Sequence, residues 1–309
     1  MNRQTSIGII GTGWVGSSVA ISVLHQGIAN RLMLSDARPG LAEGEAMDLR
    51  HGSAFYPAAE IDSVDPEGML QAQAIVIAAG RNSRADQSRL ELLRDNATVV
   101  RDLAARLRSY QGIVVMVSNP VDVLTALFTQ ESGLPPQRVI GTGTLLDTAR
   151  LRQALGRELG LSPHSIHAHV VGEHGDSELV LWSSASVGGI PLRRWPEWGH
   201  EREARVAESV RTAAYEIIRR KGATNHAIGL ATAALLRAML REEHRVLTVS
   251  TLHQGACGVR DVALSLPAIV AGDGIVRVLE PGLDDSERLA LMKSADLIRH
   301  SVAGLKAGA

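Results

Sequence analysis

The segment Ile7-Gly8-Ile9-Ile10-Gly11-Thr12-Gly13-Trp14-Val15-Gly16 decides the fold of this chain. A short apolar run leads into the pattern Gly-x-Gly-x-x-Gly, and Val15, Val19 and Val23 then recur at helical spacing. The first glycine permits a tight turn, the second lets the backbone approach a pyrophosphate, and the third lets the helix pack closely on the strand. The segment therefore predicts a dinucleotide-binding strand, turn and helix, with the pyrophosphate at the helix N-terminus.

An acidic residue after the second apolar run predicts which dinucleotide binds. Asp36 lies 20 residues after Gly16, where its carboxylate can accept hydrogen bonds from the adenosine ribose hydroxyls and would repel a 2′-phosphate. NAD is therefore favoured over NADP, although the neighbouring Arg38 is a cation that suits a phosphate. The sequence lacks the Gly-Lys pair of a P-loop and the Tyr-x-x-x-Lys pair of short-chain dehydrogenases.

Short apolar runs ending in glycine, aspartate or Asn-Pro predict buried strands at 7–10, 31–35, 74–78 and 113–117. Amphipathic helical stretches lie between them, which is the βαβ rhythm of a parallel sheet. The later part predicts helices and strands at 201–220, 224–243, 246–252, 259–270 and from about 284. We expect an α/β protein with a Rossmann-type doubly wound parallel sheet in an NAD-binding domain (1–145), followed by a mixed α+β substrate domain (146–309).

The composition is that of an ordinary globular protein. The 309 residues are 45% hydrophobic and carry a net charge of −1, which gives no reason to expect nucleic-acid or membrane binding. The single cysteine, Cys257, excludes an internal disulfide and a thiolate metal cluster. With no apolar segment typical of a signal peptide or a membrane span, we expect a cytoplasmic protein.

Three polar motifs carry candidate chemistry. Ser118-Asn119-Pro120-Val121-Asp122 follows the fourth predicted strand, at the sheet edge where doubly wound folds bind ligands. Asp147 and Arg150 lie three residues apart and would share one helix face. Gly172-Glu173-His174-Gly175-Asp176-Ser177-Glu178 holds a histidine, whose ordinary pKa lies near neutrality. Beside a nicotinamide cofactor, such a histidine can move a proton while the cofactor moves a hydride.

These motifs together resemble the L-lactate/malate dehydrogenase family over nearly the whole chain. The resemblance rests on the glycine loop, Ser-Asn-Pro-Val-Asp, Leu-Asp-Thr-Ala-Arg, Gly-Glu-His-Gly-Asp-Ser-Glu and Lys221-Gly222-Ala223-Thr224, in that order and spacing. It is closest to the bacterial L-lactate dehydrogenases, and it implies an NAD-dependent oxidoreductase that interconverts a 2-oxo acid and an L-2-hydroxy acid.

The resemblance also implies roles for individual residues. His174 would be the acid/base, with Asp147 orienting its imidazole and favouring the imidazolium. Arg150 would clamp the substrate carboxylate in a bidentate way that lysine cannot match. Arg89, on a loop that closes over the substrate, would polarise the carbonyl. The expected substrate pocket is completed by Asn119, Thr224 and Ser83, and the expected cofactor contacts are Gly11, Gly13, Val15, Gly16, Asp36, Gly80, Ser118 and Asn119.

The loop before Arg89 departs from the family's patterns. Six residues before the catalytic arginine, members that prefer lactate usually carry glutamine and members that prefer malate carry arginine, whereas this chain carries Ser83. Serine offers neither the charge for a second carboxylate nor the volume of glutamine. We expect lactate first and a bulkier acid such as 2-hydroxyisocaproate second, while the adjacent Arg84 keeps malate open.

The resemblance extends to regulation and assembly. Bacterial lactate dehydrogenases activated by fructose bisphosphate use an arginine and a histidine at the positions of Arg152 and His167, cations suited to phosphate at a subunit interface. We expect a homotetramer and leave open whether these two residues are only surface charges. A non-catalytic NAD-binding redox sensor is the alternative of another class. No metal is expected, because the histidines between 164 and 174 have no nearby cysteine and no helical His-Glu-x-x-His spacing.

Overall fold

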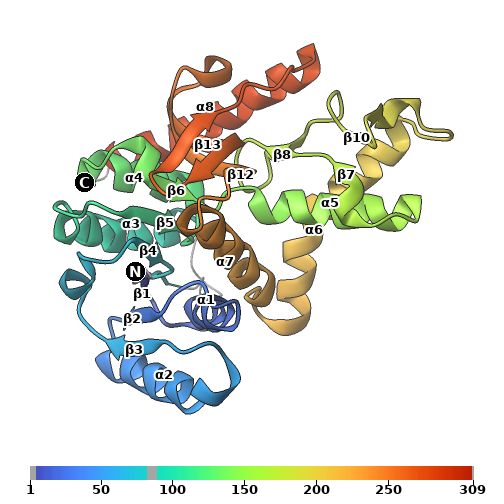
Figure 1. Cartoon of the computed structure of the whole chain (residues 1–309). Helices are drawn as coiled ribbons and strands as arrows, with labels where there is room; N and C mark the ends of the chain where they lie inside the picture. Colours follow the sequence, from blue (N-terminus) through green and yellow to red (C-terminus); the bar gives the residue numbers. More distant parts are fainter. Residues whose placement is uncertain (1–4, 82–88, 308–309) are drawn as a thin grey trace.

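The computed structural model describes residues 5–81 and 89–307 and is built around one nine-stranded sheet (Figure 1). The strand order is β14-β13-β12-β6-β5-β4-β1-β2-β3, and β1 to β6 run parallel in the Rossmann order 3-2-1-4-5-6. These six strands are β1 (Ser6–Ile10), β2 (Arg31–Ser35), β3 (Glu60–Ser63), β4 (Ala74–Ile77), β5 (Ile113–Met116) and β6 (Val139–Gly141). The predicted parallel doubly wound sheet is confirmed.

Of these six parallel strands, the sequence analysis did not name β3 and β6. β3 is an edge strand with the sequence Glu-Ile-Asp-Ser and only Ile61 fully buried, so it lacks an apolar run. β6 has three residues, which is too short for a periodic signal.

Helices cover both faces of the parallel sheet because alternate strand residues point to opposite sides. Ile75 and Ile77 pack into the core beneath α3 (Arg89–Arg106) and α4 (Val121–Ser132), whereas Val76 packs into the core beneath α1 (Trp14–His25) and α2 (Pro39–His51). The carboxyl ends of the strands therefore lie between two helical layers, as in other ligand-binding doubly wound sheets.

The later part of the chain extends the same sheet and adds a separate lobe. Strand β12 (Arg245–Gln254) pairs antiparallel with β6, and β13 (Arg260–Ala271) and β14 (Gly274–Val278) follow it. Helices α7 (His226–Leu240) and α8 (Asp285–Ala307) pack on opposite faces of this extension. The lobe contains α5 (Leu145–Leu159), α6 (His200–Lys221) and two small antiparallel sheets, lying away from β1–β3 in Figure 1.

The small sheets are formed by short strands. They are β7 (Ile166–His167), β10 (Ser186–Val187) and β11 (Ile190–Pro191) in one sheet and β8 (Val170–Val171) and β9 (Leu179–Val180) in the other. Short 3₁₀ helices are η1 (Ser53–Phe55), η2 (Pro66–Met69), η3 (Pro136–Arg138), η4 (Pro163–Ser165), η5 (Leu192–Arg194) and η6 (Ala256–Gly258). Among the described residues, none of the helices has the length and apolar character needed to cross a bilayer.

Candidate active site

The glycine loop leaves the N-terminus of α1 open to a cavity of about 840 Å³. Gly11 has a φ of +94°, and a Cβ there would lie 2.5 Å from the backbone nitrogen of Ala79. A Cβ on Gly16 would lie 1.8 Å from the carbonyl oxygen of Gly11, whereas a Cβ on Gly13 would meet no atom within 4 Å. Gly11 and Gly16 thus hold the turn tight, and Gly13 faces the open space in which a pyrophosphate fits.

Asp36 is tied to this loop at the end of β2. Its Oδ2 accepts a hydrogen bond from the backbone N–H of Thr12 at 2.9 Å, and its Oδ1 accepts one from the N–H of Arg38 at 3.0 Å. The carboxylate lines the cavity and still has acceptor capacity for ribose hydroxyls. The Nε of Arg38 lies 3.6 Å from Asp36 Oδ1 on a largely exposed side chain, so the charge pair is screened by water.

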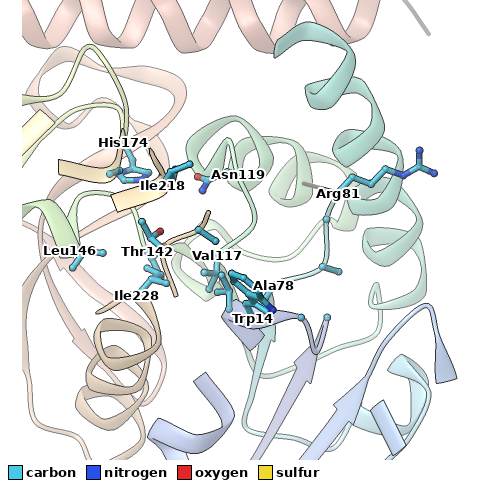
Figure 2. A pocket seen from close by; sticks show the side chains of 18 of the residues that line it. Trp14, Ala78, Arg81, Val117, Asn119, Thr142, Leu146, His174, Ile218 and Ile228 are labelled. Carbon is cyan, nitrogen blue, oxygen red and sulfur yellow. The ribbon is translucent and has the colours of Figure 1, made fainter. Parts of the chain in front are cut away.

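The cavity brings together most of the residues that the sequence predicts for cofactor and substrate. Those that line it are Gly11, Gly13, Val15, Asp36, Gly80, Asn119, Arg150, His174 and Thr224. In Figure 2, His174 and Asn119 face the hollow from different segments, while the side chain of Arg81 extends away from it. Gly16, Ser118 and Asp147, which the sequence also predicts for the site, are buried and do not line the cavity.

His174, Asp147 and Arg150 form one hydrogen-bonded group. Asp147 and Arg150 lie on the first turns of α5, and His174 lies on the loop between β8 and β9. Asp147 Oδ2 is 2.6 Å from His174 Nδ1, and Asp147 Oδ1 accepts from Arg150 Nη1 at 2.7 Å. The Asp147 side chain is 2% exposed, against 28% for His174 and 15% for Arg150. A buried carboxylate therefore holds two cationic groups that reach the cavity.

The surroundings of His174 favour its protonated form. Burial alone lowers the pKa of His174, but the charge of Asp147 and their hydrogen bond raise it to about 9. Burial opposes ionisation of Asp147 as well, yet His174 and Arg150 hold the pKa of Asp147 below its ordinary value. Burial and the charge of Asp147 raise the pKa of Glu178 to about 8. One ring nitrogen of His174 and one carboxylate oxygen each of Asp147 and Glu178 lie within 4.8 Å of one another.

Ser118 and Asn119 are fixed by neighbours that the sequence analysis did not name. Ser118 Oγ donates to the carbonyl oxygen of Ala79 at 2.5 Å, which joins the ends of β4 and β5. Asn96 Nδ2 donates to the carbonyl oxygen of Asn119 at 2.9 Å, and Asn96 Oδ1 accepts from the N–H of Arg81 at 2.7 Å. Asn96 is a buried amide in the apolar stripe of α3, and that mismatch is the sequence signal that could have identified it.

The loop predicted to distinguish substrates lies partly outside the described residues. Ser83 and Arg84 lie outside the described residues. Arg89 begins helix α3, but its side chain is likewise outside what the structure describes. The roles expected for Ser83, Arg84 and Arg89 therefore stay predictions.

Arg152 lines a second cavity of about 280 Å³ between α5, α7 and β12, with His164, His169 and Arg245 also in the lining. Its Nε donates to the carbonyl oxygen of Ala168 at 3.1 Å. His167 is exposed on β7 and is not part of this lining. Of the two expected effector residues, Arg152 therefore lines this cavity, whereas His167 lies on the exposed surface nearby.

Comparison with known proteins identifies relatives along the full chain. The NAD binding domain of lactate/malate dehydrogenases matches residues 5–141, and the alpha/beta C-terminal domain of lactate/malate dehydrogenases matches residues 144–307. An L-lactate dehydrogenase of Salinibacter ruber is 43% identical over 100% of both chains. One from Thermus aquaticus is 40% identical over 97% of this chain and 99% of its own.

Solved structures of lactate dehydrogenases are also similar to this chain over nearly its full length. The minor L-lactate dehydrogenase of Enterococcus mundtii superposes with a TM-score of 0.94 at 37% identity, covering 97% of this chain and 98% of that one. MGS-M5, a lactate dehydrogenase enzyme from a deep-sea metagenome library, also has a TM-score of 0.94, at 38% identity over 98% and 99% of the two chains.

Proposed function

The chain belongs to the lactate/malate dehydrogenase family, and from that premise we propose that it interconverts pyruvate and L-lactate as an NAD-dependent oxidoreductase. The observation that carries the proposal is the buried Asp147 bonded to His174 at 2.6 Å, at the wall of the cavity that the glycine loop also lines. A proton-moving group and a dinucleotide cradle thereby share one hollow.

The residues of this chain fit the cofactor. The open face of Gly13 and the N–H groups at the start of α1 suit a pyrophosphate, and Asp36 suits the ribose hydroxyls of NAD. When bound, NAD supplies the hydride exchange with the substrate carbon. Val15, Gly80 and Asn119 line the remaining wall on this side of the cavity.

His174 supplies the proton. Because its Nδ1 is committed to Asp147, the Nε2 atom is left to donate to the carbonyl oxygen of the 2-oxo acid and to accept the proton in the reverse direction. Arg150 uses one nitrogen for Asp147 and keeps further N–H donors for the substrate carboxylate. Asn119 and Thr224 line the same hollow and complete the substrate pocket.

We expect pyruvate to be the preferred 2-oxo acid, by about tenfold or more over oxaloacetate and 2-oxoisocaproate, as differences in pocket contacts of this size allow. NADH consumption measured with each acid tests this. A strong preference for oxaloacetate would show that Arg84, rather than Ser83, sets specificity and that malate is the product. A preference for 2-oxoisocaproate would assign the bulkier substrate, and no turnover of any of the three would refute the enzyme itself.

We further propose that fructose bisphosphate activates the enzyme through Arg152 and His167 at a subunit contact of a cytoplasmic homotetramer. Arg152 lies in a cavity that Arg245 also lines, and two guanidinium groups at one hollow support an anionic effector. The same assay run with and without the effector tests it, because activation should lower the KM for pyruvate. Absence of any change would leave Arg152 and His167 as ordinary surface charges. We also propose that the NAD-binding and substrate domains divide near residue 145.

The raised pKa of His174 predicts opposite pH profiles for the two directions. Reduction needs the imidazolium, so kcat/KM for pyruvate should be level at neutral pH and fall as the pH rises through about 9. Oxidation of lactate needs neutral His174 and should rise over the same range. The Asp147–His174 pair should stabilise the fold below the ordinary histidine pKa and lose this contribution as the pH rises through about 9. Asp147→Asn should move both kinetic midpoints downward, and unchanged midpoints would contradict the assignment.

A further inference from the structure

Asp122 contacts the catalytic loop from the cofactor-binding part of the chain. It is the second residue of α4 and is 2% exposed. Its Oδ2 accepts a hydrogen bond from the backbone N–H of His174 at 2.6 Å. Asn119, which lines the active-site cavity, lies three residues earlier in the chain. One short segment therefore presents a group to the cavity and holds the backbone of the proposed acid/base.

This hydrogen bond is one of three made by successive amides of the loop. The N–H of Gly172 donates to the carbonyl oxygen of Ser265 at 2.9 Å, and the N–H of Glu173 donates to Ser294 Oγ at 2.7 Å. Those two acceptors lie on β13 and α8, in the later part of the chain. Only the third bond, to Asp122, joins this amide run to the segment that follows β5 and carries Asn119.

A carboxylate at this place has an electrostatic consequence beyond the backbone contact. Asp122 Oδ1 has no hydrogen-bond partner of normal geometry among the described residues; burial raises the pKa of this carboxyl, and the nearby Ser250 hydroxyl lowers it. Such burial is costly, and a neutral acceptor would suffice to hold one amide. Among the described residues, the charges that act most strongly on the His174 imidazole are those of Asp147, Asp122 and Glu178, and Arg150 is bonded to the other oxygen of Asp147. Glu173 is the further charged group near Asp122.

We propose that Asp122 is a positioning residue for His174, holding the loop backbone in register with Asn119 and favouring the imidazolium through its own negative charge. The inference rests on the proposed role of His174. Two substitutions separate the hydrogen bond from the negative charge. An asparagine at position 122 can still accept the hydrogen bond but carries no charge, whereas an alanine provides neither.

The test compares Asp122→Asn and Asp122→Ala with Thr129→Ala. Thr129 is also buried on α4, and its hydroxyl donates to the carbonyl oxygen of Thr125 within the same helix, at 2.7 Å, so its removal reports general damage to the helix. Asp122→Ala should lower kcat for pyruvate about 10- to 100-fold through misplacement of His174. Its binding of NADH, followed by the fluorescence of the nucleotide, should change by no more than about twofold, as expected for loss of a transition-state interaction.

Asp122→Asn should keep kcat at pH 6 within about threefold, while its kcat/KM midpoint moves down by about half a unit or more because a neighbouring charge is lost. Wild-type kcat in Asp122→Ala, or an equal loss in Thr129→Ala, would overturn the proposal. If Asp122→Ala does not fold, an unshifted pH profile in Asp122→Asn overturns it and a shifted profile supports it. His174→Ala is run in parallel: if it retains activity, the proposed function of His174 fails, whereas its inactivity beside a normal Asp122→Ala defeats the Asp122 proposal alone.

Discussion

His174→Ala should lower turnover of pyruvate by about a thousandfold or more, within the range that general acid catalysis contributes. The variant removes the proton donor, whose Nδ1 is hydrogen-bonded to Asp147 at 2.6 Å. Among the described residues that line the cavity, no other histidine could replace it. Single-turnover measurement with NADH in excess reports the chemical step directly.

Binding of NADH should survive in the same variant, because the glycine loop and Asp36 lie on the other side of the cavity. Nucleotide fluorescence at equilibrium measures it. His226→Ala is a matched control, since His226 is an exposed histidine at the start of α7 that does not line the cavity. An unchanged rate in His174→Ala would refute the assignment, and loss of both NADH binding and turnover would show a folding defect instead.

Arg150→Lys should lower kcat/KM for pyruvate by about a hundredfold, the size expected when one partner of a buried, hydrogen-bonded charge pair is lost. Lysine keeps the charge but has a single nitrogen, so it cannot bond Asp147 Oδ1 and hold a carboxylate with a planar fork at the same time. The effect should fall mainly on KM.

A smaller effect on kcat should accompany it, since Asp147 would be held less firmly. Initial rates across a range of pyruvate concentrations separate the two parameters. Arg157→Lys provides the control, because Arg157 is exposed on the same helix, two turns further along. A loss confined to kcat with an unchanged KM would contradict the role of Arg150 as the carboxylate clamp.

The sequence predicted the parts of this fold that depend on local pattern. The strand at β1, the glycine turn and α1 follow one another within twenty residues, so periodicity and glycine placement identify them. The pairing of Ser250 with Gly141, which joins β12 to the parallel sheet, links residues 109 apart and has no local signal. The mixed character of the later part was predicted, but not that its long strands would continue the first sheet.

In the candidate site too, residues within local motifs were predicted, whereas residues that act through contacts with distant parts of the chain were missed. His174, Asp147 and Arg150 were noticed as polar residues in short motifs, and the family resemblance then implied their joint roles. Asp122 lay inside one of those motifs and was not singled out, because its contact is with a backbone amide 52 residues away. Asn96 acts through two backbone groups in the same way. Residues that hold the backbone of a site leave little trace in sequence pattern, since many polar types satisfy an N–H.

The continuous sheet has a consequence for how the protein unfolds. Strand β12 pairs directly with β6, and α4 packs against strands from both the N-terminal and the C-terminal part of the chain. If one part unfolded alone, the part that stays folded would expose an unpaired strand edge and an apolar helix face. Thermal denaturation should therefore appear as one cooperative transition, with cofactor-binding and substrate-binding residues losing their order at the same temperature.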